Sequence, residues 1–325
     1  MEKKISFIIP MFNSDKYICN CINSILRQDY DNKEIIVIDD GSNDDSVKIC
    51  NNVFKEQIKI IETNNFGAPA ARNKGISYAT GNYVMFIDSD DFLMDDPTII
   101  SGMISKMEIE NSKIVFGKMN LVDECGNVLK DKKICFNEIK DKKMFNMLID
   151  PLPSNKIYDL DFIKEKGIYF DNVRIGQDLN FYLKYIAFCD NVAFYNEYVS
   201  NYRIVSNSIS RTYTIKILDI VNSLNYVDRF YKNNNIYNDN HKYINVVRMQ
   251  HLYSQLSKNI YFKSFITRAF IKNYLTNEIR KEKINYAEYD KSTVTFIRKI
   301  RIKIHIKKLN IYRFYKLIEE KKNGK

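Results

Sequence analysis

Three acidic residues stand within four positions at the end of an apolar run. Asp88, Asp90 and Asp91 follow the segment 83–87, whose residues Tyr-Val-Met-Phe-Ile are typical of a buried strand. Two or three carboxylates with open water positions suit Mg²⁺ or Mn²⁺, which usually binds one or two protein carboxylates together with substrate phosphates. The pattern therefore indicates a nucleotide-diphosphate ligand. The alternative is a solvated turn that caps the next helix.

The elements that must position these acids alternate between strand and helix. Near-continuous apolar strands separated by helices indicate a parallel sheet that is covered on both faces. Ligands of such sheets bind at the carboxyl ends of the strands, and polar clusters follow three of the strands there, at 10–13, 39–42 and 88–91. The pattern is mixed between 110 and 210 and helical beyond 212. Strands are predicted at 5–9, 34–38, 58–61 and 83–87, and helices at 17–26 and 68–79.

These clusters occur with further short motifs in an order that resembles family 2 glycosyltransferases with the GT-A fold. The resemblance covers residues 5–95, and a weaker match from Ser154-Asn155-Lys156 to Gln177-Asp178 extends it to about 210. It implies an α/β, Rossmann-like, mostly parallel sheet flanked by helices at 1–211, with a nucleotide-binding half (1–95) and an acceptor half (96–211). A mainly helical region would follow at 212–325. The motifs are Ile8–Asn13, Ile38–Ser42, Asn65-Phe66-Gly67, Ala70-Ala71-Arg72-Asn73-Lys74-Gly75, Ala79-Thr80-Gly81 and Phe86–Asp91.

The resemblance also implies which residues bind the nucleotide sugar. Asp39 or Asp40 would accept a hydrogen bond from uracil, and Arg72 would lie near the nucleotide. The alternatives are a turn with Asp caps ahead of Gly41, and a surface helix residue at Arg72. Pro10, Phe12 and Asn13 would line the base and ribose pocket. The D-x-D motif, Asp88-Ser89-Asp90, would hold the ribose and, through Mn²⁺ or Mg²⁺, the diphosphate, with Asp91 the less certain metal ligand.

Inverting sugar transfer also needs a carboxylate that takes the proton from the acceptor hydroxyl. A metal that neutralises the leaving diphosphate performs a different task, so the base should lie outside the D-x-D motif. The resemblance implies that Asp178 is this base, with Gln177 in place of the family's usual Glu and with Asn155 and Lys156 also on the acceptor side. The alternative for Asp178 is an acid that stabilises a helix N-terminus. Tyr202, Arg203 and the stretch 207–210 lie where acceptor or diphosphate contacts, or a structural loop, are equally expected.

The basic residues in excess lie in the tail, residues 291–325. The net charge is +10, and the tail alone carries 12 Lys/Arg and 2 Asp/Glu. The tail suggests docking on an anionic membrane surface, against the alternative of a solvated terminal helix. No nucleic-acid-binding motif occurs in the rest of the chain. We expect a cytoplasmic protein, because no apolar run reaches the length of a membrane span and neither a signal peptide nor a zinc-binding Cys/His pattern is present.

Together these features predict a metal-dependent, inverting transferase. It would move one sugar from a UDP-linked donor to a hydroxyl of a glycan or lipid-linked acceptor in bacterial surface polysaccharide synthesis, such as that of capsule or lipopolysaccharide. Polymerising relatives carry Q-x-x-R-W, and this chain has no Trp, so transfer of a single sugar is expected. One alternative is an inactive nucleotide-sugar-binding or scaffold protein of this fold. Another is a nucleotidyltransferase, which needs a Gly-rich loop that segment 10–14 lacks.

Overall fold

The computed structural model describes residues 2–132, 140–205, 215–258, 265–281 and 284–300. The chain divides into two compact units, which we describe separately. The first unit contains Met1–Cys135 and Asp150–Arg211, and the second contains Phe136–Ile149 and Thr212–Lys325. Segment 136–149 therefore belongs to the helical second unit, although 1–211 was expected to form one domain.

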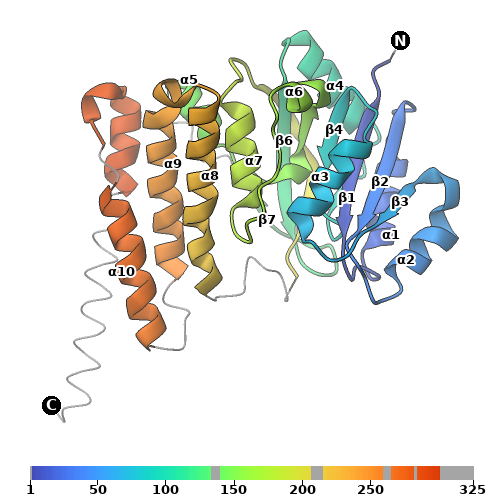
Figure 1. Ribbon diagram of the computed structural model, residues 1–325. Coiled ribbons are helices and arrows are strands. Elements are labelled where there is room, and N and C mark those ends of the chain that lie inside the picture. The colour runs from blue at the N-terminus through green and yellow to red at the C-terminus, as the bar shows by residue number, and fades with distance from the viewer. Residues whose placement is uncertain (1, 133–139, 206–214, 259–264, 282–283, 301–325) are drawn as a thin grey trace. The chain divides into compact units, whose positions relative to one another are not determined.

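The first unit begins with the predicted parallel sheet (Figure 1). The four strands lie in the order β3-β2-β1-β4, and all three neighbouring pairs are parallel. Helix α1 packs on one face, against Phe7 and Ile9 of β1, while α3 packs on the other face, where a Cβ added at Gly75 would lie 2.3 Å from Ile8. Burial on both faces explains the apolar runs of the inner strands β1 and β4, whereas the edge strand β3 has no buried residue and begins and ends with a charged one. The bounds are β1 Ile5–Met11, α1 Ile18–Leu26, β2 Lys33–Asp39, α2 Ser46–Ile49, β3 Lys59–Glu62, α3 Ala68–Tyr78 and β4 Tyr83–Phe86.

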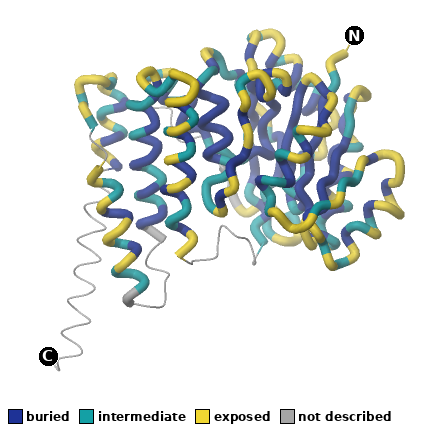
Figure 2. The backbone as a smooth tube through the Cα atoms, viewed as in Figure 1, coloured by how far each residue is buried: buried dark blue, intermediate teal, exposed yellow. Residues whose placement is uncertain are grey.

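The second half of the sheet is mixed. Strand β8 pairs antiparallel with both β4 and β6, β9 runs parallel to β6, and β5 pairs antiparallel with β9. Helix α7 packs its Phe181 ring edge-to-face on Phe86 and Tyr158, with 5.5 Å between ring centroids in each pair. Strands β6 and β8 are buried along most of their length (Figure 2). The bounds are β5 Phe92–Leu93, α4 Ile99–Ile109, β6 Ile114–Val122, β7 Val128–Lys132, β8 Lys156–Asp159, α6 Leu160–Glu165, α7 Gln177–Ile186 and β9 Ala193–Arg203.

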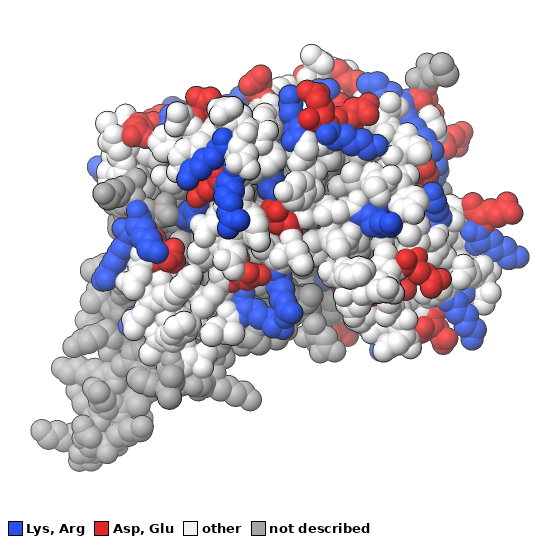
Figure 3. All heavy atoms as spheres, viewed as in Figure 1, with Lys and Arg blue, Asp and Glu red and all other residues white. Residues whose placement is uncertain are grey.

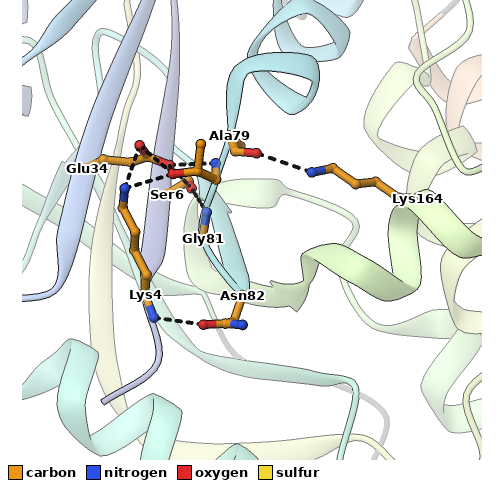
Figure 4. Close-up of polar contacts among 8 residues, drawn as sticks. Lys4, Ser6, Glu34, Ala79, Gly81, Asn82 and Lys164 are labelled. Carbon is orange, nitrogen blue, oxygen red and sulfur yellow. Dashed lines mark hydrogen bonds and ion pairs between the residues drawn. The ribbon is translucent and has the colours of Figure 1, made fainter. Parts of the chain in front are cut away.

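A polar network fixes the start of β4, the strand that leads to the acidic cluster (Figure 4). The Glu34 carboxylate accepts hydrogen bonds from Ser6 Oγ, the Thr80 backbone N–H and Lys4 Nζ. The Gly81 N–H donates to Ser6 Oγ at 3.0 Å. A Cβ at Gly81 would lie 2.7 Å from the same oxygen, so only glycine fits. The Ala-Thr-Gly motif therefore anchors β4 beside β1 and sets where its carboxyl end lies.

The second unit is helical, as the sequence predicts. A partly buried ion pair between Arg248 of α9 and Asp228 of α8 joins two of its helices. Residues 291–300 are also helical, and Ile297 and Ile300 are buried; the rest of the basic tail, 301–325, lies outside the described residues. Within the described ranges, no helix combines the length and apolar character needed to cross a membrane. The bounds are α5 Lys142–Leu148, α8 Asp219–Asn233, α9 Tyr237–Lys258 and α10 Phe265–Lys281.

Candidate active site

The three acids after β4 lie on a tight turn at the carboxyl edge of the sheet. Asp91 N–H donates to the carbonyl oxygen of Asp88 at 2.9 Å, which closes the turn. Ser89 is buried, and its hydroxyl lies 2.7 Å from Ser14 Oγ in the loop after β1. Asp88 and Asp90 are partly exposed. The strand therefore delivers two accessible carboxylates to the edge where ligands bind in sheets of this kind.

Asp91 differs from its two neighbours because the protein occupies both of its carboxylate oxygens. The side chain is 1% exposed; Oδ2 accepts a hydrogen bond from Ser154 Oγ at 2.8 Å, and Oδ1 accepts one from Arg203 N–H at 2.9 Å. Burial, together with the charges of Asp88 and Asp90, raises the pKa of Asp91 well above its ordinary value. Asp91 thus fastens the turn to distant segments. The expectation that it binds a metal does not agree with this geometry.

Arg203, at the end of β9, stabilises the acidic turn through its side chain. Its Nε donates to the Asp90 carbonyl oxygen at 2.9 Å, and Nη1 donates to the Glu124 carbonyl oxygen at 2.6 Å. The guanidinium lies over the rings of Tyr17 and Phe92, 5.1 and 4.9 Å from their centroids. Of the two roles weighed from sequence, this favours the structural one over contact with an acceptor or diphosphate.

Arg72 joins the acidic turn to the predicted base. It lies on α3, is 2% exposed, and places Nη2 2.5 Å from Asp88 Oδ1 and Nη1 3.1 Å from Asp178 Oδ1. The alternative that Arg72 is a surface helix residue is therefore wrong. A buried guanidinium between two carboxylates holds both at fixed positions and compensates their charge.

Asp178 is the second residue of α7, which begins directly after Gly176, a residue in a left-handed conformation with φ of 82°. Burial raises the pKa of Asp178 to about 6, with Arg72 opposing the shift and Asp88 adding to it. A carboxylate with such a pKa is a stronger base than an ordinary Asp and still ionised at neutral pH. Beside it, Oε1 of Gln177 is buried and has no hydrogen-bond partner among the described residues. This unpaired acceptor fits a hydroxyl donor.

Asn155 and Lys156 were expected on the acceptor side, but the structure places both in the interior. Asn155 Nδ2 donates to the Gly117 carbonyl oxygen at 2.7 Å. Lys156 is fully buried, and its ammonium donates to the carbonyl oxygens of Asp150 and Leu152 at 2.6 and 2.7 Å. An ammonium satisfied in this way stabilises the loop before β8, and neither side chain is positioned to contact an acceptor.

The residues expected in the nucleotide pocket organise the loops after β1 and β2. Asp40 accepts hydrogen bonds from the backbone of Phe66 and Gly67 at 2.8 and 2.7 Å, which fixes the loop after β3. Asp39 accepts longer ones from Gly41 and Ser42, at 3.2 and 3.1 Å. Asp39 therefore caps the turn that contains Gly41, which is the alternative left open from sequence, whereas Asp40 holds a loop that is distant in sequence. A carboxylate has about four acceptor positions, so Asp39, with the weaker bonds, retains more capacity for a ligand.

The side chains after β1 belong to the same edge. Asn13 N–H donates to Ser42 Oγ and Asn13 Oδ1 accepts from Asn43 N–H, both at 2.9 Å, which joins the loops after β1 and β2. Phe12 is 46% exposed, although it is large and apolar, whereas Pro10 is buried within β1. The sheet edge thus combines an exposed aromatic ring with a rigid polar loop, which suits a base and its ribose.

The carboxylates at this edge fit a hard divalent cation only when a bound ligand supplies further oxygen atoms to coordinate it. Among the described residues, no group of three or more His, Cys, Asp or Glu side chains is placed to hold a metal. Asp88 and Asp90 are the accessible pair. Burial and the charge of Asp88 raise the pKa of Asp90 to about 6, and the charges of Arg203 and Arg72 offset this shift only in part. Because Mg²⁺ usually takes one or two carboxylates plus phosphates, the pair fits a metal bound together with a diphosphate.

Comparisons with known proteins show similarity to glycosyltransferases. The family model "Glycosyl transferase family 2" matches residues 6–165. Glycosyltransferase GlyG of Streptococcus pneumoniae is 29% identical over 65% of this chain and 74% of its own length. A cholesterol galactosyltransferase of Borreliella burgdorferi is 26% identical over 92% of this chain and 83% of its own length.

A solved structure extends the likeness to the fold. Residues 1–349 of Staphylococcus aureus TarS, in complex with UDP-GlcNAc, superpose with a TM-score of 0.57 at 18% identity, over 86% of this chain and 89% of that one. The fold is thus GT-A, as expected from the sequence, and the chain belongs to glycosyltransferase family 2.

Proposed function

We propose that this glycosyltransferase is metal-dependent and inverting, and that it transfers one sugar from a UDP-linked donor to a hydroxyl. One observation carries the proposal: Arg72 bridges Asp88 of the D-x-D turn and Asp178 at the start of α7. Two carboxylates that share one buried guanidinium lie near enough to act on the two sides of one reacting carbon, with separate tasks.

In the proposed mechanism, Asp178 accepts the proton of the acceptor hydroxyl as that oxygen attacks the anomeric carbon. The new bond forms as the bond to the diphosphate oxygen breaks, and the diphosphate leaves with the electron pair. Mg²⁺ or Mn²⁺ bound by Asp88 and Asp90 would neutralise the charge on that leaving group. Arg72 holds the Asp178 carboxylate in place, and the unpaired Oε1 of Gln177 would accept a hydrogen bond from a neighbouring hydroxyl of the acceptor and so orient it.

The names of two relatives support the proposed classes of donor and acceptor. The TarS structure contains UDP-GlcNAc, which supports a UDP-sugar as donor. We propose that its base binds beside Phe12, Asn13 and Asp39. The cholesterol galactosyltransferase carries a lipid acceptor in its name, which supports a lipid-linked acceptor. We therefore propose a role in assembling a glycan or glycolipid of the bacterial surface.

A panel of nucleotide sugars tests the reaction. We expect hydrolysis or transfer from one or more UDP-sugars in the presence of Mn²⁺, and loss of that turnover on addition of EDTA. The measurement is release of UDP, with pyrophosphate release assayed in parallel. Binding of UDP without turnover of any donor would favour the inactive scaffold protein, and release of pyrophosphate would favour the nucleotidyltransferase.

We also propose that the basic tail docks on an anionic membrane surface. Charges of both signs are mixed over the face shown in Figure 3, and the excess of basic over acidic residues comes from the sequence of the tail. Because Ile297 and Ile300 are buried, the chain should be cut after Ile300, not earlier. Each Lys or Arg near an anionic surface contributes about 1 kcal/mol.

Neutralising Arg301, Lys303, Lys307 and Lys308 by substitution with Gln should therefore lower binding to vesicles that contain phosphatidylserine by at least about tenfold. Co-sedimentation measures this effect, and deletion of 301–325 should abolish binding. Vesicles of phosphatidylcholine alone serve as the control. Equal sedimentation of wild type and the Gln variant would refute docking through the tail.

A further inference from the structure

Asn73 forms a contact that has no part in the proposed roles of the D-x-D turn or of Asp178. This residue follows Arg72 on α3. Its Nδ2 donates to the Phe170 carbonyl oxygen at 2.8 Å, and its Oδ1 accepts from the Phe170 N–H at 2.9 Å. One side-chain amide thus satisfies both backbone groups of a residue 97 positions away, as a neighbouring strand would. The pair of bonds fixes both the distance and the orientation of the Phe170 backbone relative to α3.

Phe170 in turn packs on the helix that begins with Asp178. Its ring stacks on the ring of Phe181, with 4.0 Å between centroids and 6° between planes. Phe181 lies three residues after Asp178, which places it on the same side of α7. The Arg72 guanidinium carbon lies 5.3 Å from the centroid of the Phe170 ring. Phe170 is therefore held by α3 through its backbone and contacts α7 through its ring.

A second contact holds the same segment from the side of α7. Lys184 forms a buried ion pair with Asp171 and donates a hydrogen bond to the Tyr169 carbonyl oxygen at 3.2 Å. The segment 169–171 is thus tied to α7 by Lys184 and by the stacked rings, and to α3 by Asn73. Without Asn73, the segment and α7 would remain joined to each other, but their paired hydrogen bonds to α3 would be lost.

We propose that Asn73 is a positioning residue: by fixing Phe170 to α3, it sets the separation of Arg72 and Asp178. This inference rests on the proposed role of Asp178 as the base. Arg72 and Asn73 are neighbours on α3. Arg72 reaches the site and Asn73 sets the distance between α3 and α7, so the two side chains move together. A shift of about 1 Å in a catalytic group can cost about 100-fold in rate.

The test compares Asn73→Ala and Asn73→Asp with Lys74→Ala. Asp retains the acceptor for the Phe170 N–H but loses the donor and repels the carbonyl oxygen, whereas Lys74 is exposed on the same helix and serves as the matched control. We expect kcat to fall about 10- to 100-fold in both Asn73 variants. The KM for the donor and the Kd for UDP, measured by calorimetry, should stay within about twofold, and Lys74→Ala should match wild type.

A double-mutant comparison shows whether Asn73 acts through the base. In an Asp178→Asn background, Asn73→Ala should cost little further activity, because the group that it positions can no longer accept a proton. Losses that multiply in the double variant, or a kcat in both Asn73 variants equal to that of wild type, would overturn the proposal. A fall in UDP affinity that matches the fall in kcat would also overturn it, since that result indicates general disruption.

Hydrogen exchange gives a readout that does not depend on activity. Amide exchange at residues 177–180 should be faster in Asn73→Asp than in wild type and unchanged in Lys74→Ala. If no UDP-sugar is turned over by the wild type, the proposed function fails, while faster exchange would still establish the positioning contact. Unchanged exchange at 177–180 in a folded Asn73→Asp would refute the positioning role itself.

Discussion

Asp178→Asn is expected to lower kcat by about 10²- to 10⁴-fold, the usual contribution of a general base. The amide has the shape of the carboxylate but cannot accept the acceptor's proton. The Kd for UDP should change little, because Asp178 acts on the acceptor and not on the nucleotide. Turnover of the donor identified in the panel and calorimetry with UDP measure the two quantities.

The same residue predicts the acid limb of the pH profile. Since burial raises the pKa of Asp178 to about 6, kcat/KM should fall about tenfold per pH unit below that value, as the base becomes protonated. Asp161→Asn, at an exposed position of α6, is the matched control and should retain both rate and profile. An Asp178→Asn variant with the wild-type rate would contradict the assignment.

Strands β1 to β4 and helices α1 and α3 were predictable because each carries its own local signal. Strands buried on both faces must be apolar throughout, and the residues that follow them at the ligand edge must be polar, so the position of Asp88 and Asp90 follows from the strand that ends before them. The helices in between follow from periodicity. None of these predictions needed a contact between distant parts of the chain.

The errors concern polar residues whose partners are far away in sequence. Asp91 accepts a hydrogen bond from the backbone N–H of Arg203, and Asn155 donates one to the carbonyl oxygen of Gly117. Lys156 is the exception, because the carbonyl groups that satisfy it are near in sequence and only the conformation of their loop turns them towards the ammonium. Sequence alone suggests that a charged residue is exposed or binds a ligand, since burial of a charge is costly without a partner. Arg72 shows the opposite case: the surface alternative failed because Asp178, 106 positions later, compensates its charge. For Arg203, the only sign of a role near the site was its position in the sequence.

Asp90→Asn is expected to remove metal-dependent activity and, at the same time, to stabilise the protein without metal. In the folded chain the pKa of Asp90 is raised to about 6, against about 3.9 in an unfolded chain. Between about pH 4 and pH 6 the folded chain therefore binds more protons at this site, so the free energy of unfolding falls as the pH rises through that window. Above it, the ionised carboxylate destabilises the fold by about 1–3 kcal/mol. The neutral amide does not.

Urea unfolding measures the stability of Asp90→Asn and of wild type, with and without metal. At pH 7.5 without metal, Asp90→Asn should unfold at a higher urea concentration than wild type, and the difference should shrink towards pH 4. With Mn²⁺ and UDP the order should reverse, because only the wild type gains from binding. Asp31→Asn, at an exposed position before β2, controls for the loss of one charge. An Asp90→Asn protein that is less stable at pH 7.5 would show that the protein compensates the charge of Asp90. An Asp90→Asn protein that still needs Mn²⁺ for turnover would move the metal to other ligands.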